Sequence, residues 1–256
     1  NAVLSFVDSE MLDAGINGIA KGDGIYQPSE ATLHSVTLRN FGMMPAQEVS
    51  LQLDNGSVIK LPEIPARSLV TIKGAGLSKI ADSAAIGSTA RISLKVLSKL
   101  TSNDVVEAAH FDSIGGGILK NADKKAVRVD YPLTLSGLAL NSQLLQGVSN
   151  KLSLTVSNQS KRPYKGDLKV DVSVNSESLI LKKLFSTLAS VESSAQLSDA
   201  EVLVTDEADL YRTLNFSASI SQNGVTLGVL SSDMQTMAKA AYSDKVKRPV
   251  LVANSD

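Results

Sequence analysis

The most regular feature of the chain is an alternation of apolar and polar residues with a period of two. Every second side chain is apolar in five segments: residues 49–53, 92–96, 151–156, 168–174 and 214–220. Such alternation is typical of half-buried β-strands, whose apolar side chains share the inner face of a sheet. Turns rich in Gly, Pro, Asn and Ser separate these short segments, so the sequence predicts an all-β protein built as sandwiches or barrels.

A second feature is an internal repeat. Residues 34–40 (His-Ser-Val-Thr-Leu-Arg-Asn) match residues 152–158 (Leu-Ser-Leu-Thr-Val-Ser-Asn) at an offset of 118 residues, from 34 to 152. Each copy continues into a polar turn that contains a proline, Pro45 or Pro163, and then into another alternating segment. A repeat of this length is too long for a solenoid unit and fits whole domains in tandem. We therefore expect two similar β-domains.

The join between these domains is expected near residues 115–132. Three consecutive glycines, Gly115 to Gly117, and a polar stretch up to Lys125 precede a new apolar segment at 133–140. Clusters of this kind are typical of loops between folded segments. We therefore divide the chain into a first domain, 1–126, and a second domain with a C-terminal tail, 127–256.

Two segments depart from the period of two and predict short helices. Residues 77–86 could form one or two helical turns across a sheet edge. Met234, Met237, Ala238 and Ala241 follow a capping residue, Asp233, at the spacing of one helix face.

Composition narrows the function classes. The chain has 256 residues, of which 43% are hydrophobic, and this fraction supports packed cores. Its 25 basic and 26 acidic side chains leave a net charge of -1, which argues against nucleic acid as a partner. The absence of cysteine excludes disulfides, thiolate zinc sites and cysteine nucleophiles. We see neither a targeting signal nor an apolar run of the roughly 18–20 residues that a transmembrane segment needs, and we expect the chain to be part of a longer protein.

Candidate catalytic residues are few. The two histidines are His34 and His110, and His110 lies two residues before Asp112, on the same face of an expected strand. A His–Asp pair can orient a base, but a nucleophile on a sharp turn is also required, and no Gly-x-Ser-x-Gly motif occurs. His34 occupies the repeat position of Leu152, so we expect a structural, partly inward ring. No phosphate-binding GxxxxGK[ST] motif is present either. The sequence predicts a non-enzyme.

A metal site has one candidate region. Asp8, Asp13, Asn17, Asp23 and Glu30 fall in an early glycine-rich stretch, and hard oxygen ligands are what calcium takes. The spacing is not that of an EF-hand, and Asp-Gly is also an ordinary turn. We retain Asp13, Asn17, Asp23 and Glu30 as calcium candidates and expect no other cofactor.

Other ligand classes find little support. The chain has five Tyr, five Phe and no Trp, which disfavours carbohydrate because sugar platforms depend on exposed aromatic faces. The short basic clusters, such as Lys161-Arg162 and Lys182-Lys183, are typical of solvated faces or guarded strand edges.

One stretch carries a family resemblance. Lys21-Gly-Asp-Gly-Ile-Tyr-Gln-Pro-Ser-Glu30, then Val36-Thr-Leu-Arg-Asn-Phe-Gly42, then Pro45-Ala-Gln-Glu-Val-Ser-Leu51, resembles bacterial immunoglobulin-like domains of the cell-adhesion-related (CARDB) type. The resemblance is best over residues 20–75. Ser29 stands where the family has Gly, and the second copy keeps Asn158 but lacks the Asp-Gly loop. The resemblance implies immunoglobulin-like β-sandwiches in a secreted or surface protein.

Together these observations predict two tandem immunoglobulin-like β-sandwiches that act as a non-catalytic binding or spacer module of a bacterial surface, periplasmic or secreted protein. The expected partner is another protein, through interaction or adhesion, or the neighbouring domains of a longer chain. The alternative is the accessory C-terminal region of a secreted hydrolase, such as a protease, whose catalytic domain lies outside this sequence.

Overall fold

The structure is a computed structural model, and it describes residues 2–98, 122–140, 144–145, 147–205 and 212–237. All elements in these ranges are β-strands, and they form two compact units, Asn1–Asp130 and Tyr131–Asp256. None of the described residues lies in a helix long and apolar enough to cross a bilayer. The prediction of an all-β chain made of two tandem immunoglobulin-like sandwiches is confirmed.

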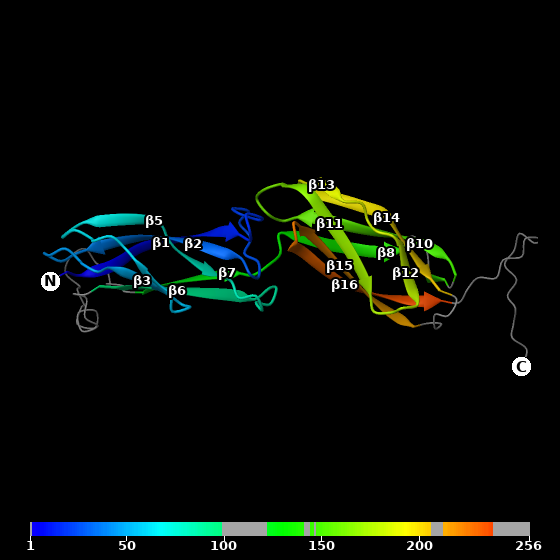
Figure 1. The fold of residues 1–256 in the computed structure, drawn as a ribbon, viewed down its shortest axis with the longest axis horizontal. Coiled ribbons are helices and arrows are strands. Elements are labelled where there is room, and N and C mark those ends of the chain that lie inside the picture. Colours follow the sequence, from blue (N-terminus) through cyan, green and yellow to red (C-terminus); the bar gives the residue numbers. More distant parts are fainter. Residues whose placement is uncertain (1, 99–121, 141–143, 146, 206–211, 238–256) are drawn as a thin grey trace, which may run out of the picture. The chain divides into compact units, whose positions relative to one another are not determined.

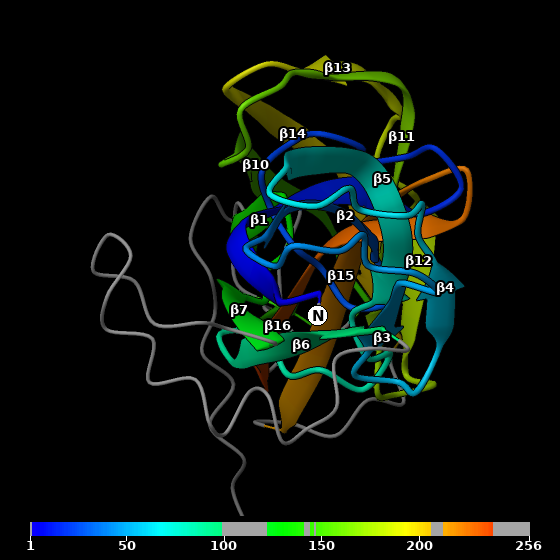
Figure 2. The ribbon, with the colours of Figure 1, turned by 90° about the vertical axis from the view of Figure 1, so that its left-hand side faces the viewer.

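The first unit consists of two antiparallel sheets (Figures 1 and 2). One sheet has the order β1-β2-β5, with strands β1 (Leu4–Gly15), β2 (Ala31–Asn40) and β5 (Leu69–Lys79). The other has the order β4-β3-β6-β7, with strands β4 (Val58–Lys60), β3 (Ser50–Leu53), β6 (Thr89–Leu97) and β7 (Ala122–Arg128). Strand β7 pairs with β6 up to Arg128, and the division between the units follows Asp130.

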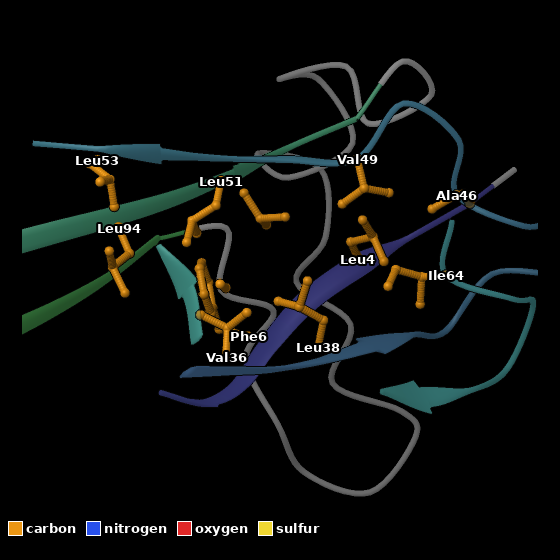
Figure 3. Close-up of a cluster of buried hydrophobic side chains, with 13 residues drawn as sticks. Leu4, Phe6, Val36, Leu38, Ala46, Val49, Leu51, Leu53, Ile64 and Leu94 are labelled. Atoms are coloured by element: carbon orange, nitrogen blue, oxygen red, sulfur yellow. The ribbon is translucent and has the colours of Figure 1, made fainter. Parts of the chain in front are cut away.

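The core of the first unit lies between these sheets. Alternate residues of β2, such as Val36 and Leu38, point inward and are fully buried. Leu51 and Leu94 reach the same cluster from the opposite sheet (Figure 3). The period of two in the sequence therefore becomes the inner face of each sheet.

The second unit repeats this plan with more strands. Its first sheet has the order β12-β14-β10-β8, with strands β12 (Leu179–Lys183), β14 (Ser194–Val204), β10 (Ser149–Asn158) and β8 (Leu133–Leu140). Its second sheet has the order β13-β11-β15-β16-β9, with strands β13 (Leu188–Val191), β11 (Tyr164–Val174), β15 (Thr213–Gln222), β16 (Val225–Met237) and β9 (Leu144–Leu145). Leu214, Phe216, Ala218 and Ile220 of β15 are all buried, as their alternation predicts.

The sequence repeat corresponds to equivalent strands, β2 and β10, which end at Asn40 and Asn158. In both units the asparagine side chain organises the turn that follows. Asn40 Nδ2 donates to Met44 O at 2.8 Å, and Asn158 Nδ2 donates to Arg162 O at 2.7 Å, four residues on in each case. The side-chain oxygen in each unit accepts the backbone N–H two residues on, from Gly42 or from Ser160. The repeat thus preserves a hydrogen-bonded corner as well as a strand.

The two helix predictions are wrong. Residues 77–79 belong to β5, and the following residues, up to the start of β6, form turns. Met234 lies in β16 opposite Leu214, while Ala238 and Ala241 lie outside the described residues. For residues 77–79 and for Met234, pairing with a neighbouring strand supplies backbone hydrogen bonds that local spacing cannot reveal, and this tertiary pairing overrides the helical pattern.

Candidate functional site

The acidic, glycine-rich stretch forms the connection between β1 and β2, at one end of the first unit. Ile16 and Ile19 exchange backbone hydrogen bonds across a tight turn. Further along, Tyr26 pairs with Val129, and Asp130 N donates to Tyr26 O at 2.9 Å. This acidic loop, residues 16–30, therefore holds the chain at the point where it leaves the first unit.

Asp13 organises the loop through its carboxylate. Its oxygens accept the backbone N–H groups of Gly22 and, at 2.7 Å, of Gly24. Both glycines have positive φ, 69° and 83°, a conformation that costs glycine little. The Asp13 side chain is 7% exposed, so these backbone donors compensate a largely buried negative group.

Glu30 is the most perturbed group in the loop. Its side chain is 0% exposed, and Oε2 accepts the backbone N–H of Gln27 at 2.9 Å. Its other oxygen, Oε1, is buried and has no hydrogen-bond partner among the described residues. Burial, reinforced by the negative charges of Asp23 and Asp13, raises the pKa of the Glu30 carboxyl to about 8, against the lowering effect of the backbone groups of Gln27 and Gly15. Glu30 therefore keeps its proton at neutral pH.

The other acidic-loop residues have separate roles. Asp23 is 2% exposed, and its Oδ1 accepts the N–H of Ile25 at 2.7 Å. Asn17 is exposed and lies in the Ile16–Ile19 turn with φ at 49°. Burial, followed by the charge of Asp13, raises the pKa of the Tyr26 hydroxyl, which donates to Met11 O at 3.0 Å.

The calcium site stays a prediction. The structure brings Asp13, Asp23 and Glu30 into one loop end, where their carboxyl groups accept backbone N–H groups. Across the described ranges, no three His, Cys, Asp or Glu side chains are grouped so that they could hold a metal ion. An ion bound through Asp13 Oδ2, Asp23 Oδ1 or Glu30 Oε2 would replace a hydrogen bond that the oxygen already accepts, whereas Glu30 Oε1 accepts none.

His34 belongs to a second buried polar cluster in the first unit. Its Nε2 contacts Ser78 Oγ and lies 3.2 Å from Thr32 Oγ1, while the two hydroxyl oxygens lie 2.7 Å apart. The ring is 0% exposed, and burial lowers the pKa of His34. The structural role expected for His34 fits this site, because a catalytic Ser–His pair needs access to a substrate.

The partners of His34 could not be found from the sequence. Ser78 lies 44 residues further along and meets His34 only because β5 pairs with β2. The only sequence signal for this buried polar cluster is that Thr32 and His34 both fall at inward positions of the same predicted strand. His110 and Asp112 lie outside the described residues.

The outer face of the sheet β1-β2-β5 carries an apolar stripe. Leu12 lies opposite Leu33, and Leu33 lies opposite Leu77, so the three leucines cross the sheet side by side. Leu12 is 48% exposed and Leu77 is 56% exposed. We call these three residues the leucine stripe. The stripe ends at β5, which pairs with β2 alone among the described strands.

The second unit has an open groove of about 590 Å³ beside the β15–β16 turn. Its lining mixes apolar side chains with one acidic and one basic residue: Asp167, Lys169, Val170, Leu184, Phe185, Thr187, Ser221, Asn223 and Gly224. Lys182 and Lys183 are exposed on the edge strand β12, as the guarded-edge interpretation of this basic pair predicts.

No protein-family model matches the chain, and neither does any curated protein. Among solved structures, red sea bream transglutaminase is 9% identical with a TM-score of 0.33, over 91% of this chain and 31% of that one. A mutant of Salmonella alpha-2-macroglobulin is 15% identical with a TM-score of 0.32, over 84% of this chain and 16% of that one. Domains 4 and 5 of the S-layer protein SbsC are 11% identical with a TM-score of 0.25, over 92% and 100%.

The chain thus spans less than a third of the first two of these proteins. At these identities and TM-scores, the structural similarity gives no information about activity or partners. The assignment of two immunoglobulin-like sandwiches stands on the strand order and register of this chain itself.

Proposed function

We propose that the chain is a non-catalytic binding or spacer module of the CARDB type, in a bacterial surface, periplasmic or secreted protein. The observation that carries this proposal is the tandem pair of sandwich units, each with the same asparagine-anchored corner. Two modules in tandem reach further than one, and they can combine two weak contacts with the same partner. The partner that we expect is another protein.

The buried polar groups support a non-catalytic role. Ser78 and His34 contact each other, yet they are 5% and 0% exposed, so a substrate cannot approach the hydroxyl. Asp13 and Glu30 accept backbone hydrogen bonds in a loop, an arrangement that stabilises a turn. These contacts are accounted for by folding alone.

The test compares binding with chemistry in the full chain. The fluorescently labelled chain is titrated onto intact cells of its source, and saturable binding is measured. We expect His110→Ala and Asp112→Ala to bind as tightly as the native chain, and we expect no turnover of casein or p-nitrophenyl acetate. Turnover that disappears in His110→Ala, with an unchanged circular dichroism spectrum, would contradict a non-catalytic module.

The contribution of the tandem arrangement is tested by an insertion. A flexible Gly/Ser segment placed between Asp130 and Tyr131 leaves both units intact but lengthens the connection between them. If both units engage the cell surface together, the insertion lowers the apparent affinity because the effective concentration of the second contact falls. An unchanged affinity would mean that one unit binds alone.

A further inference from the structure

We propose that two copies of this chain associate through the open edge of β5, in an antiparallel β5–β5 pair related by a two-fold axis at Leu77. The pair would join two three-stranded sheets into one continuous six-stranded sheet. This association is independent of the proposed function, since it concerns an edge of the first unit and no outside partner.

The direction of the backbone groups on β5 follows from a hydrogen bond at its end. Ile80 N donates to Glu30 O at 2.8 Å, so these two residues form a hydrogen-bonded pair facing β2. In an antiparallel ladder such pairs alternate, so Ser78 also faces β2. The N–H and C=O groups of Leu77 and Lys79 therefore point away from β2, toward the open edge.

The second unit shows what covers the equivalent edge. Strand β14 corresponds to β5, because it pairs with β10 as β5 pairs with β2. On its other side β14 pairs antiparallel with β12, through Ile180 opposite Leu203 and Lys183 opposite Glu201. In the described part of the first unit no strand takes the place of β12. Among the described strands of the first unit, none occupies the position beside Leu77 where one more antiparallel strand would pair.

The residues around Leu77 are complementary to themselves. A two-fold axis at Leu77 sets Leu77 against its own copy and Ser78 against Gly76, both within the regular part of β5. Lys79 then faces Ala75, at the register shift of the other copy, so no like charges meet. The leucine stripe then runs unbroken across both sheets, with Leu77 of each copy at its centre. Opposed apolar side chains on one sheet face stabilise strand pairs, and a two-fold interface requires this kind of self-complementarity.

The other long edges of the first unit are guarded. Strand β1 carries Asp8 and Glu10 and has two register shifts, and Ser9 Oγ donates to the Asp123 carboxylate of β7. Strand β7 is itself rich in charged residues (Asp123, Lys124, Lys125 and Arg128). Charges and bulges of this kind block edge-to-edge pairing. Strand β5 has one register shift of its own, between Ile72 and Gly76, so its regular edge is the stretch from Gly76 to Lys79. In this stretch Lys79 already pairs with Asp82 at 2.6 Å, and Leu77 stands exposed between Gly76 and Ser78.

Because the chain contains no cysteine, a single introduced cysteine can form a disulfide only with its own copy in a second chain. In a hydrogen-bonded antiparallel pair the two Cα atoms lie about 5.5 Å apart, within the range of a disulfide. Leu77→Cys should therefore form a disulfide-linked dimer under mild oxidation. Leu12→Cys is the matched control, because Leu12 is similarly exposed on the same stripe but would be five strand spacings, or about 24 Å, from its copy.

Sedimentation velocity of the full chain supplies the second measurement. We expect the native chain to shift from monomer toward dimer as concentration rises through the micromolar range. Leu77→Lys should weaken association about tenfold or more, because it sets two positive charges against each other across the interface. The control Leu12→Lys should leave the association constant unchanged. A native chain that stays monomeric, or equal cross-linking rates for Leu77→Cys and Leu12→Cys, would overturn the proposal.

Discussion

Glu30 offers a test in which replacing a titratable carboxyl group with a neutral amide should stabilise the protein at high pH. The carboxyl is fully buried, and its pKa rises from 4.5 to about 8 mainly through loss of solvation. The unfolded chain therefore loses this proton near pH 4.5, while the folded chain keeps it to about pH 8. Between these values the folded state binds more protons than the unfolded state, so the free energy of unfolding falls as pH rises.

The magnitude follows from the same shift. A difference of one pKa unit corresponds to about 1.4 kcal/mol, so three and a half units, from 4.5 to about 8, give at most about 5 kcal/mol. The loss begins near pH 4.5 and is complete above pH 8. Glu30→Gln keeps an oxygen to accept the Gln27 N–H but carries no titrating proton. We expect this variant to match the native chain at about pH 5 and to exceed it in stability at about pH 9.

Urea unfolding followed by circular dichroism, at several pH values between these limits, measures the difference between the native chain and Glu30→Gln. Taking the difference removes contributions from other groups that titrate in both proteins. Glu63→Gln is the matched control, since Glu63 is an exposed glutamate of the same unit and the substitution makes the same chemical change at the surface. A flat difference for Glu30→Gln, or one that rises in favour of the native chain at high pH, would refute the reasoning.

Three further predictions concern contacts described above. Asn40→Ala should lower the free energy of unfolding by about 2–4 kcal/mol in urea titrations, and more than Asn158→Ala does, because Asn40 is 0% exposed and leaves several backbone groups unsatisfied. Gly228→Ala should lower the free energy of unfolding by about 2 kcal/mol or more, because a Cβ there would lie 2.4 Å from Leu133 O. In the control Gly56→Ala, the new Cβ meets no atom within 4 Å and only the positive φ is unfavourable. Equal losses in melting temperature for the two variants would contradict this. If the acidic loop holds calcium, millimolar calcium should raise the melting temperature and Glu30→Gln should abolish the increase, while an unchanged temperature would refute the site.

The sequence was informative where the residues of one short segment decide the local structure. The period of two identified the buried faces of β10, β11 and β15, because alternate side chains of a strand must face opposite sides of its sheet. The offset between Asn40 and Asn158 located equivalent corners, because an asparagine side chain can bond its own backbone two residues on.

What sequence could not supply was long-range pairing. Residues 77–79 extend β5 because they lie opposite 31–33 of β2, and their local spacing does not report this register. The same limit hides the contact of Ser78 with His34. Composition alone also does not show that backbone N–H groups reach the carboxyl groups of Asp13 and Glu30.

The acidic loop also explains why a buried, unfavourable group is tolerated in the first unit. Asp13 fixes Gly24 through a backbone hydrogen bond, and this positions the next turn so that Tyr26 pairs with Val129. A proton on Glu30 removes one of the three negative charges that Asp13, Asp23 and Glu30 would otherwise hold out of solvent. Ionisation of Glu30 should therefore loosen the loop before it unfolds the sandwich, because the leucine-rich core lies away from it. Hydrogen exchange at the Asp130 amide, which donates to Tyr26 O, should accelerate above pH 8 beyond the intrinsic rate in the native chain and not in Glu30→Gln.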